Sequence, residues 1–234
     1  ENIGDWNCFT STLNINDIAI FGEDIYCATD GGILQFSLFE KSFHTYTKLH
    51  GLNTTNLSVI EAGENHILWI GGNEPGFIQR FDSSKEMVIT EFPYEFSEIS
   101  HVVSGDSIAY AVYRDNQDWG IAEYRYENGI FNHRDLYPVW QLAENGINDI
   151  EIMDTTVFVG TQSGLFKGTA GENPNWWTSI SEEIVGNVTD IEISGDSLLF
   201  ILDTEVYSMN LDSQEIEGSG ATNLSLLESL SSGE

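Results

Sequence analysis

The sequence predicts an all-β fold, a β-propeller of four-stranded antiparallel blades, and three observations lead to this prediction. The same order of short apolar strands and tight turns occurs five times along the 234 residues, at intervals of roughly 40–45 residues. One such unit is too small to bury both faces of its sheet, so neighbouring units must stack face to face. The chain has only four prolines, and the repeated segments lack a helical hydrophobic period.

Each repeat opens with a strand in which apolar and polar residues alternate, which places one set of side chains on each face of the sheet. We align Ile18 with Leu57, Ile99, Ile150 and Ile191, which gives intervals of 39, 42, 51 and 41 residues. The five opening strands are expected at residues 15–20, 56–60, 98–103, 147–152 and 188–193.

Three further strands follow in each repeat, and Gly or Asp marks the turns because both residues tolerate the backbone of a tight hairpin. The second strands are expected at 25–28, 68–71, 108–112, 157–160 and 198–202. The third strands fall within 30–36, 74–81, 119–124, 163–166 and 205–209. The fourth strands are expected at 43–46, 87–90, 130–133, 176–180 and, with a weaker pattern, 214–217.

The repeats predict a propeller over residues 1–217 and a tail or linker rich in Gly, Ser and Glu over residues 218–234. The blades are expected at about 15–52, 53–96, 97–142, 143–187 and 188–217. Residues 5–11 have the pattern of an outer strand, so two arrangements remain open. Either Trp6–Thr10 completes the last blade and closes a five-bladed ring, or the chain is part of a larger propeller.

The charge of the chain excludes several partners. It has 38 acidic and 8 basic residues, a net charge of −30, so it repels nucleic acid and anionic lipid. No apolar run approaches 18 residues, so membrane insertion is not expected. The sequence starts at Glu1 without a basic and then apolar segment, so any signal peptide is expected to lie outside it. Cys8 and Cys27 are compatible with one disulfide or with two free thiols.

The sequence contains no signature of catalysis. It has no Walker-type loop, GxGxxG, GxSxG or HExxH, and its five histidines are scattered singly. Residues 115–120 are similar to a calcium loop but lack its bidentate acid, so a polar hairpin turn is favoured. We therefore expect no cofactor, metal site or catalytic residue. Among six tryptophans, Trp119 in the longest hairpin turn is the candidate for an exposed binding contact.

Three hairpins, at residues 26–36, 69–77 and 158–166, resemble the repeat of two-component-regulator-type β-propellers, with the approximate pattern hydrophobic-W-x-G-T-x-x-G-L-x-x-F. The resemblance covers most of residues 1–213, although the third and fifth repeats lack the Gly-Thr pair. It implies a bacterial protein outside the cytoplasm, as in sensor regions of hybrid histidine kinases and in proteins associated with type IX secretion. It also implies a binding scaffold, and it assigns no ligand residues to this sequence.

These observations lead to the expectation of a non-catalytic, exported propeller, located in the periplasm, on the cell surface or in the medium. It would act as a protein-interaction or ligand-sensing module for a protein or glycan that the sequence does not identify. Two alternatives remain open. A carbohydrate-active propeller enzyme, a hydrolase or lyase, would need acids with a His or Arg at the central channel. A purely structural domain of a larger surface, sensor or secretion-associated protein would need no ligand site.

Overall fold

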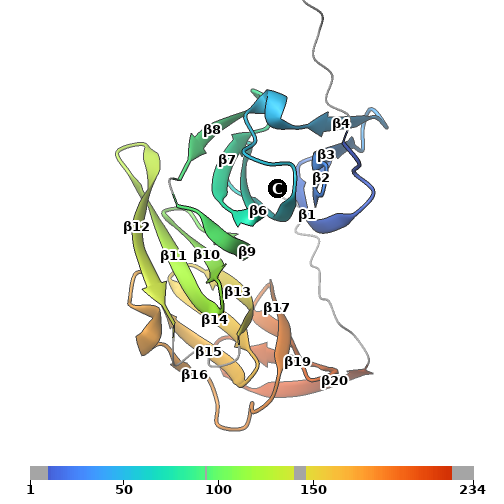
Figure 1. Cartoon of the computed structure of the whole chain (residues 1–234). Helices are drawn as coiled ribbons and strands as arrows, with labels where there is room; N and C mark the ends of the chain where they lie inside the picture. The colour runs from blue at the N-terminus through green and yellow to red at the C-terminus, as the bar shows by residue number, and fades with distance from the viewer. Residues whose placement is uncertain (1–9, 93, 140–145, 223–234) are drawn as a thin grey trace, which may run out of the picture. The chain divides into compact units, whose positions relative to one another are not determined.

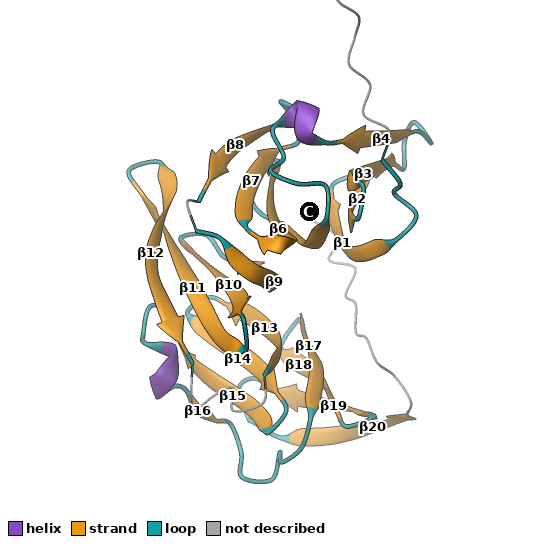
Figure 2. Ribbon diagram, viewed as in Figure 1, coloured by secondary structure: helices purple, strands orange, loops and turns teal. Residues whose placement is uncertain are grey.

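The computed structural model describes residues 10–92, 94–139 and 146–222, and antiparallel strands dominate these residues (Figures 1 and 2). They form two compact units, whose boundary lies inside one strand between Val102 and Val103. The only helical turns in these ranges are two short 3-10 helices, η1 (Lys48–His50) and η2 (Pro174–Trp176). Within the described ranges, no helix is long and apolar enough to cross a membrane.

The first unit contains two repeats and most of the opening strand of the third. Its first repeat is a sheet in chain order, β1 (Ile15–Phe21), β2 (Asp24–Thr29), β3 (Gly32–Ser37) and β4 (Phe43–Tyr46). The second repeat pairs β5 (Leu57–Ala62), β6 (Ile67–Gly76), β7 (Ile78–Asp82) and β8 (Met87–Glu91) in the same order. β6 continues further and also pairs with β9 (Phe96–Ser104), so the second repeat is not an isolated four-stranded sheet.

The second unit contains the remaining strands, again in antiparallel chain order. β10 (Ile108–Asp115), β11 (Asp118–Glu127) and β12 (Ile130–Pro138) belong to the third repeat. The fourth repeat has β13 (Ile147–Met153), β14 (Thr156–Thr161), β15 (Gly164–Thr169) and β16 (Thr178–Ser179). The fifth has β17 (Val188–Ser194), β18 (Ser197–Leu202), β19 (Glu205–Asn210) and β20 (Ile216–Thr222). The first, fourth and fifth repeats are four-stranded antiparallel sheets, whereas the strands of the second and third repeats belong to one eight-stranded sheet. The predicted all-β class is confirmed, and the predicted four-stranded unit is found in three of the five repeats.

A β-bulge near the start of the opening strand recurs in four repeats. The register shifts between Ile15 and Asp17 in β1, and the shifts in β5, β13 and β17 lie at the same place. The residue inside each bulge is polar: Asn16, Ser58, Asn148 and Thr189. A bulge turns one side chain out of the regular alternation, and three of these residues hydrogen-bond to the next repeat's opening strand.

The same hydrogen bonds correct the alignment made from the sequence. Asn16 bonds to the carbonyl of Leu57, Ser58 to that of Ile99, and Asn148 to that of Val188. Leu57 and Ile99 are therefore equivalent to Val188. The alignment from the sequence had paired them with Ile191, which lies three residues later in the fifth repeat. The equivalents of Ile18 are Ile60, Val102, Ile150 and Ile191, at intervals of 42, 42, 48 and 41 residues. The alternating pattern had fixed the strands but not their register, because apolar residues occur at both positions.

Apolar side chains between successive sheets form the core of each unit. In the first unit, a cluster that includes Tyr46, Leu57, Leu68 and Phe81 joins the first and second repeats. In the second unit, a cluster around Tyr110, Val159 and Trp177 joins the third and fourth repeats. Another, which includes Phe158, Val188, Leu198 and Phe200, joins the fourth and fifth. The free thiol of Cys27 is also buried, which raises its pKa, whereas Cys8 lies outside the described residues.

The fifth repeat differs from its expected form at the C-terminal end. Its fourth strand, β20, covers residues 216–222, so the strand extends into the tail that we expected from residue 218. β20 already pairs with the edge of β19, which is the edge that Trp6–Thr10 would have occupied as the closing fourth strand. Residues 1–9 lie outside the described residues. A closed five-bladed ring therefore stays a prediction. It would have to close in a way that does not use Trp6–Thr10 as the fourth strand of the last blade.

Candidate functional site

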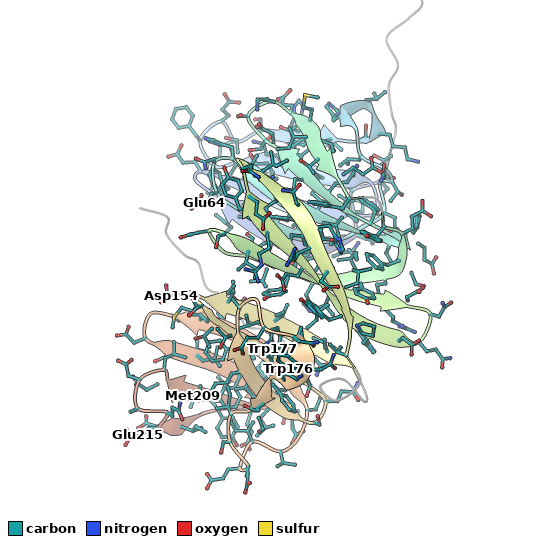
Figure 3. The ribbon with its side chains drawn as sticks, turned by 90° about the vertical axis from the view of Figure 1, so that its left-hand side faces the viewer. Glu64, Asp154, Trp176, Trp177, Met209 and Glu215 are labelled. Atoms are coloured by element: carbon teal, nitrogen blue, oxygen red, sulfur yellow. The ribbon has the colours of Figure 1, made fainter. Side chains whose placement is uncertain are left out.

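The sequence had favoured Trp119 as an exposed contact, and the structure places this residue at the start of β11. Its ring is half-buried and packs against the core cluster between the third and fourth repeats. The guanidinium carbon of Arg114 lies 6.0 Å from the ring centroid. Trp176 in η2 is far more exposed, at 73%, beside the buried Trp177 (Figure 3). The sequence does not show which of two adjacent tryptophans is exposed, and the structure distinguishes Trp176 from Trp177. A binding role of Trp119 stays a prediction.

A cleft of about 400 Å³ lies in the first unit, beside the turn that connects β7 to β8. It is formed by residues of β2, β3 and β4 in the first sheet, by the turns before β2 and between β3 and β4, and by Glu86 from the second repeat. We call it the acidic cleft, because four of its lining residues are acids and none is Lys or Arg. Its lining residues are Glu23, Asp24, Gln35, Ser37, Phe39, Glu40, Ser42, His44 and Glu86.

Local hydrogen bonds fix the β3–β4 turn that borders the acidic cleft. The backbone N–H of Glu40 donates to the hydroxyl of Ser37 at 3.3 Å, and the Ser42 hydroxyl donates to the Glu40 carboxylate at 3.3 Å. The backbone N–H of Lys41 also donates to the Ser37 carbonyl at 2.9 Å. These bonds hold the Glu40 carboxylate at the cleft and leave the ring of Phe39 80% exposed.

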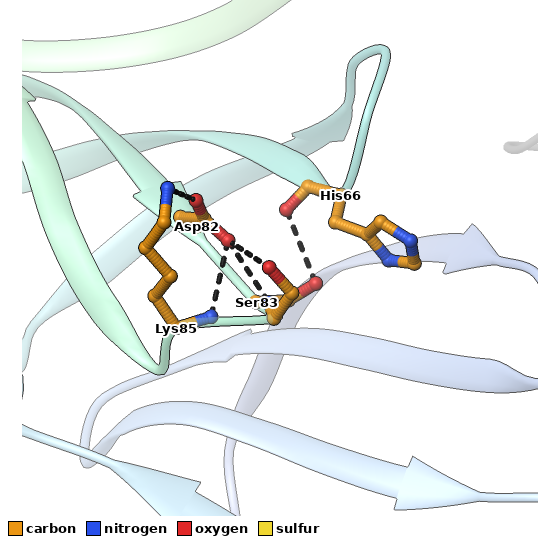
Figure 4. A network of polar contacts seen from close by, with 5 residues as sticks. His66, Asp82, Ser83 and Lys85 are labelled. Atoms are coloured by element: carbon orange, nitrogen blue, oxygen red, sulfur yellow. Dashed lines mark hydrogen bonds and ion pairs between the residues drawn. The ribbon is translucent and has the colours of Figure 1, made fainter.

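The second repeat fixes the turn that carries Glu86, and Asp82 is its central residue (Figure 4). One carboxylate oxygen of Asp82 accepts bonds from the Ser84 N–H, the Ser84 hydroxyl and the Lys85 N–H. The other oxygen accepts a 2.6 Å bond from the Lys85 ammonium. Ser83 donates its N–H and hydroxyl to the His66 carbonyl. Burial alone would raise the pKa of Asp82, but these bonds outweigh it and lower the pKa to about 2.

Two buried tyrosines next to the cleft respond to its negative charge. The hydroxyl of Tyr46 donates a 2.6 Å hydrogen bond to the side chain of Gln35, which lines the cleft. Burial raises the pKa of both Tyr26 and Tyr46, and the charges of Asp24 and Glu86 raise them further. The two carboxylates thus act on the same small region although they come from different repeats.

The chemistry of the cleft favours an organic cation. No group of three His, Cys, Asp or Glu residues that could hold a metal ion occurs among the described residues. The two cleft serines bond to Glu40, and neither is hydrogen-bonded to His44. Spread carboxylates and an exposed phenylalanine suit an ammonium or guanidinium group, which gains ion pairing and contact with an aromatic face. The sequence missed this site because its residues come from two repeats, and 38 acids obscure any pattern.

The arrangement of strands is similar to that of several solved structures. PorZ, a surface component of the type-IX secretion system of Porphyromonas gingivalis, matches 94% of this chain with a TM-score of 0.72 and 19% identity. The extracellular domain of the BT4673 two-component system of B. thetaiotaomicron matches 91% with a TM-score of 0.67 and 14% identity. The Dos1 propeller matches 90% with a TM-score of 0.64 and 12% identity. The chain has a β-propeller fold.

These similarities concern the fold alone, because each identity is below 25%. The chain spans 30% of the PorZ chain, 30% of the BT4673 domain and 61% of the Dos1 propeller. Neither a protein-family model nor a curated protein matches the sequence. The solved structures agree with the predicted propeller architecture, and two of them belong to extracellular or surface proteins.

Proposed function

We propose that this protein is an exported, non-catalytic propeller module that binds a protein partner, and that the acidic cleft receives a segment bearing Lys or Arg. The observation that carries the proposal is the meeting of four carboxylates from two repeats around one cleft, beside the exposed ring of Phe39. Loops and turns at the edge of a rigid scaffold are a usual place for binding residues. The extracellular location of structurally similar domains supports export.

The proposal can be tested by measuring the binding of fluorescent peptides with fluorescence anisotropy. We expect a peptide rich in Lys and Arg to bind and a Glu-rich peptide of equal length not to bind. Because the attraction acts between partly exposed charges, affinity should fall as NaCl is added. The double variant Glu40→Gln, Glu86→Gln should weaken binding by about tenfold or more, since two charge-assisted contacts are lost.

A matched control removes the same amount of charge away from the cleft. Glu64 and Asp154 are exposed and lie in turns of other hairpins (Figure 3), so the double variant Glu64→Gln, Asp154→Asn should bind like the native protein. Equal weakening by both double variants would show attraction to overall charge and would refute the cleft. A glycan hydrolase or lyase activity of the purified protein would refute its non-catalytic role.

A further inference from the structure

One face of the first repeat consists of uncharged side chains on all four strands. Residues that pair across neighbouring strands point to the same side of a sheet, and side chains along each strand alternate between the sides. The register of β1 to β4 therefore defines a set that we call the first-repeat face. It contains Ile15, Ile18, Ile20, Ile25, Cys27, Thr29, Gly32, Leu34, Phe36, Phe43 and Thr45. None of these residues is charged, although charged residues make up 20% of the chain.

The first-repeat face is open to solvent along β1 and at the start of β4. Ile15, Ile18 and Ile20 are all exposed, and Phe43 is 68% exposed. The Phe43 ring packs beside that of Phe36, with centroids 4.7 Å apart, so the apolar surface continues from one strand to the next. A contiguous apolar surface in contact with water usually marks an interaction site.

The equivalent face of the fifth repeat shows what kind of surface fits there. β17 and β18 pair in the same register as β1 and β2, so that Ile191 takes the place of Ile18. In the fifth repeat this face is buried, and it packs with Phe158 and Leu165 from the sheet of the fourth repeat. A face of this construction is therefore suited to the flat face of another β-sheet.

We propose that the first-repeat face binds the same face of a second copy of this chain, which gives a dimer with two-fold symmetry. An isologous contact of this kind uses one patch on both partners. Charge favours this patch, because two copies that each carry −30 repel each other, whereas the first-repeat face brings no carboxylate into the contact. Stacking the two sheets removes the exposed isoleucines and Phe43 from water, which drives the association.

The dimer contact is independent of the acidic cleft. Gln35 and His44 line the cleft, and they alternate with Phe36 and Phe43 along β3 and β4. The two pairs therefore point to opposite sides of the same sheet. The first-repeat face can be covered by a second copy while the side chains of Gln35 and His44 stay available in the cleft.

Sedimentation equilibrium of the intact chain tests the proposal. Between about 1 µM and about 200 µM protein, we expect the average mass to rise from that of one chain to that of two. Added NaCl screens the repulsion between acidic copies, so the dissociation constant of the dimer should fall with salt. Binding of a basic peptide to the cleft should respond in the opposite way. A single-chain mass under all conditions would overturn the proposal, and so would growth beyond two chains.

A pair of variants shows whether the first-repeat face makes the contact. The double variant Ile18→Ser, Ile20→Ser should raise the dissociation constant about tenfold or more, because apolar area is lost on both partners. The matched control is Ile89→Ser, Ile130→Ser, which replaces two exposed isoleucines on β8 and β12. The control should dimerise like the native chain. Equal weakening by both double variants would refute this face as the contact.

The stability of the same variants distinguishes a second copy from a part of the same chain that covers the face. At a concentration where the native chain is single, Ile18→Ser, Ile20→Ser should lower the urea midpoint no more than the control does, since both pairs are then exposed. If another part of the chain covered the face, this variant would lose more stability than the control without any change of mass. That result would overturn the proposal, and circular dichroism verifies that both variants are folded.

Discussion

At the scale of single residues, buried and half-buried acids of this very acidic chain accept hydrogen bonds from backbone N–H groups and so fix the backbone. Asp82 accepts all its bonds within one turn, whereas Asp17 and Asp149 accept theirs from two repeats. A buried carboxylate is costly unless donors surround it. The donors are mainly backbone N–H groups, as expected in a chain with only 8 basic residues.

Substitution of Asp82 should show how much the stability of the β7–β8 turn depends on the carboxylate oxygen that accepts three hydrogen bonds. Asp82→Ala removes every bond in Figure 4 that involves the carboxylate and should lower the free energy of unfolding by about 1–3 kcal/mol. Asp82→Asn keeps an oxygen for the Ser84 and Lys85 N–H bonds and loses only the ion pair with the exposed Lys85 ammonium. It should therefore cost much less. Urea unfolding measures both, and equal losses would contradict this account.

At the scale of elements, strands in three repeats pack a glycine directly against an aromatic ring. A Cβ atom on Gly72 would overlap Phe77, one on Gly120 would overlap Tyr113, and one on Gly168 would overlap Trp177. Trp177 is itself buried and meets Tyr110 edge to face, with ring centroids 5.9 Å apart. Glycine weakens the interior of a strand. Its presence at these three positions is explained by the neighbouring aromatic ring, which fills the space that a Cβ atom would need.

Gly168→Ala should therefore destabilise the fourth repeat. The added methyl group meets the indole ring near its attachment, where the ring cannot move away cheaply, and overpacking of this kind costs about 1–3 kcal/mol. Gly218→Ala is the matched control, since Gly218 is exposed on β20 and its nearest neighbour, Tyr207, lies 3.6 Å from a built Cβ. We expect the control to change the urea midpoint little. A larger loss in the control would contradict the packing argument.

At the scale of the whole molecule, the opening strands of the first and fifth repeats each lack a contact that the equivalent strands of other repeats make. Ile15 and Ile18 on β1 are 51% and 43% exposed, although the equivalent Leu57, Ile60, Val188 and Ile191 are at most 2% exposed. Thr189 occupies the bulge position of β17, and its buried hydroxyl has no hydrogen-bond partner within the described part of the chain. A closed five-bladed ring and a larger propeller would each place a neighbour there, and both stay predictions.

The net charge of −30 should make the stability of the folded chain depend on salt. Self-repulsion is stronger in the compact state than in the unfolded chain, and added ions screen it. We expect the thermal midpoint to rise by a few degrees as NaCl increases from about 0.05 M to about 0.5 M. An equal osmolarity of an uncharged sugar controls for exclusion effects. A midpoint that is unchanged or lower in salt would contradict the expectation.

The sequence by itself determined the all-β class, the five repeats and nearly all strand positions. Alternation and turn residues are local signals, and a strand such as β14 or β18 is specified by its own residues. The fourth strand of the last repeat was less certain, because residues 214–217 have little alternation and β20 begins only at Ile216.

Only the tertiary structure decided the register between repeats and the sites that depend on it. The equivalence of Ile18 and Ile60 appears once Asp17 is seen to accept the Ile60 N–H. The acidic cleft likewise joins Glu86 to residues of the first repeat that lie 42 to 63 positions earlier, and Asp149 accepts the N–H of Ile191, 42 positions further along. Such contacts depend on how sheets stack across a bulge, a relation between segments that the local pattern of either segment does not contain.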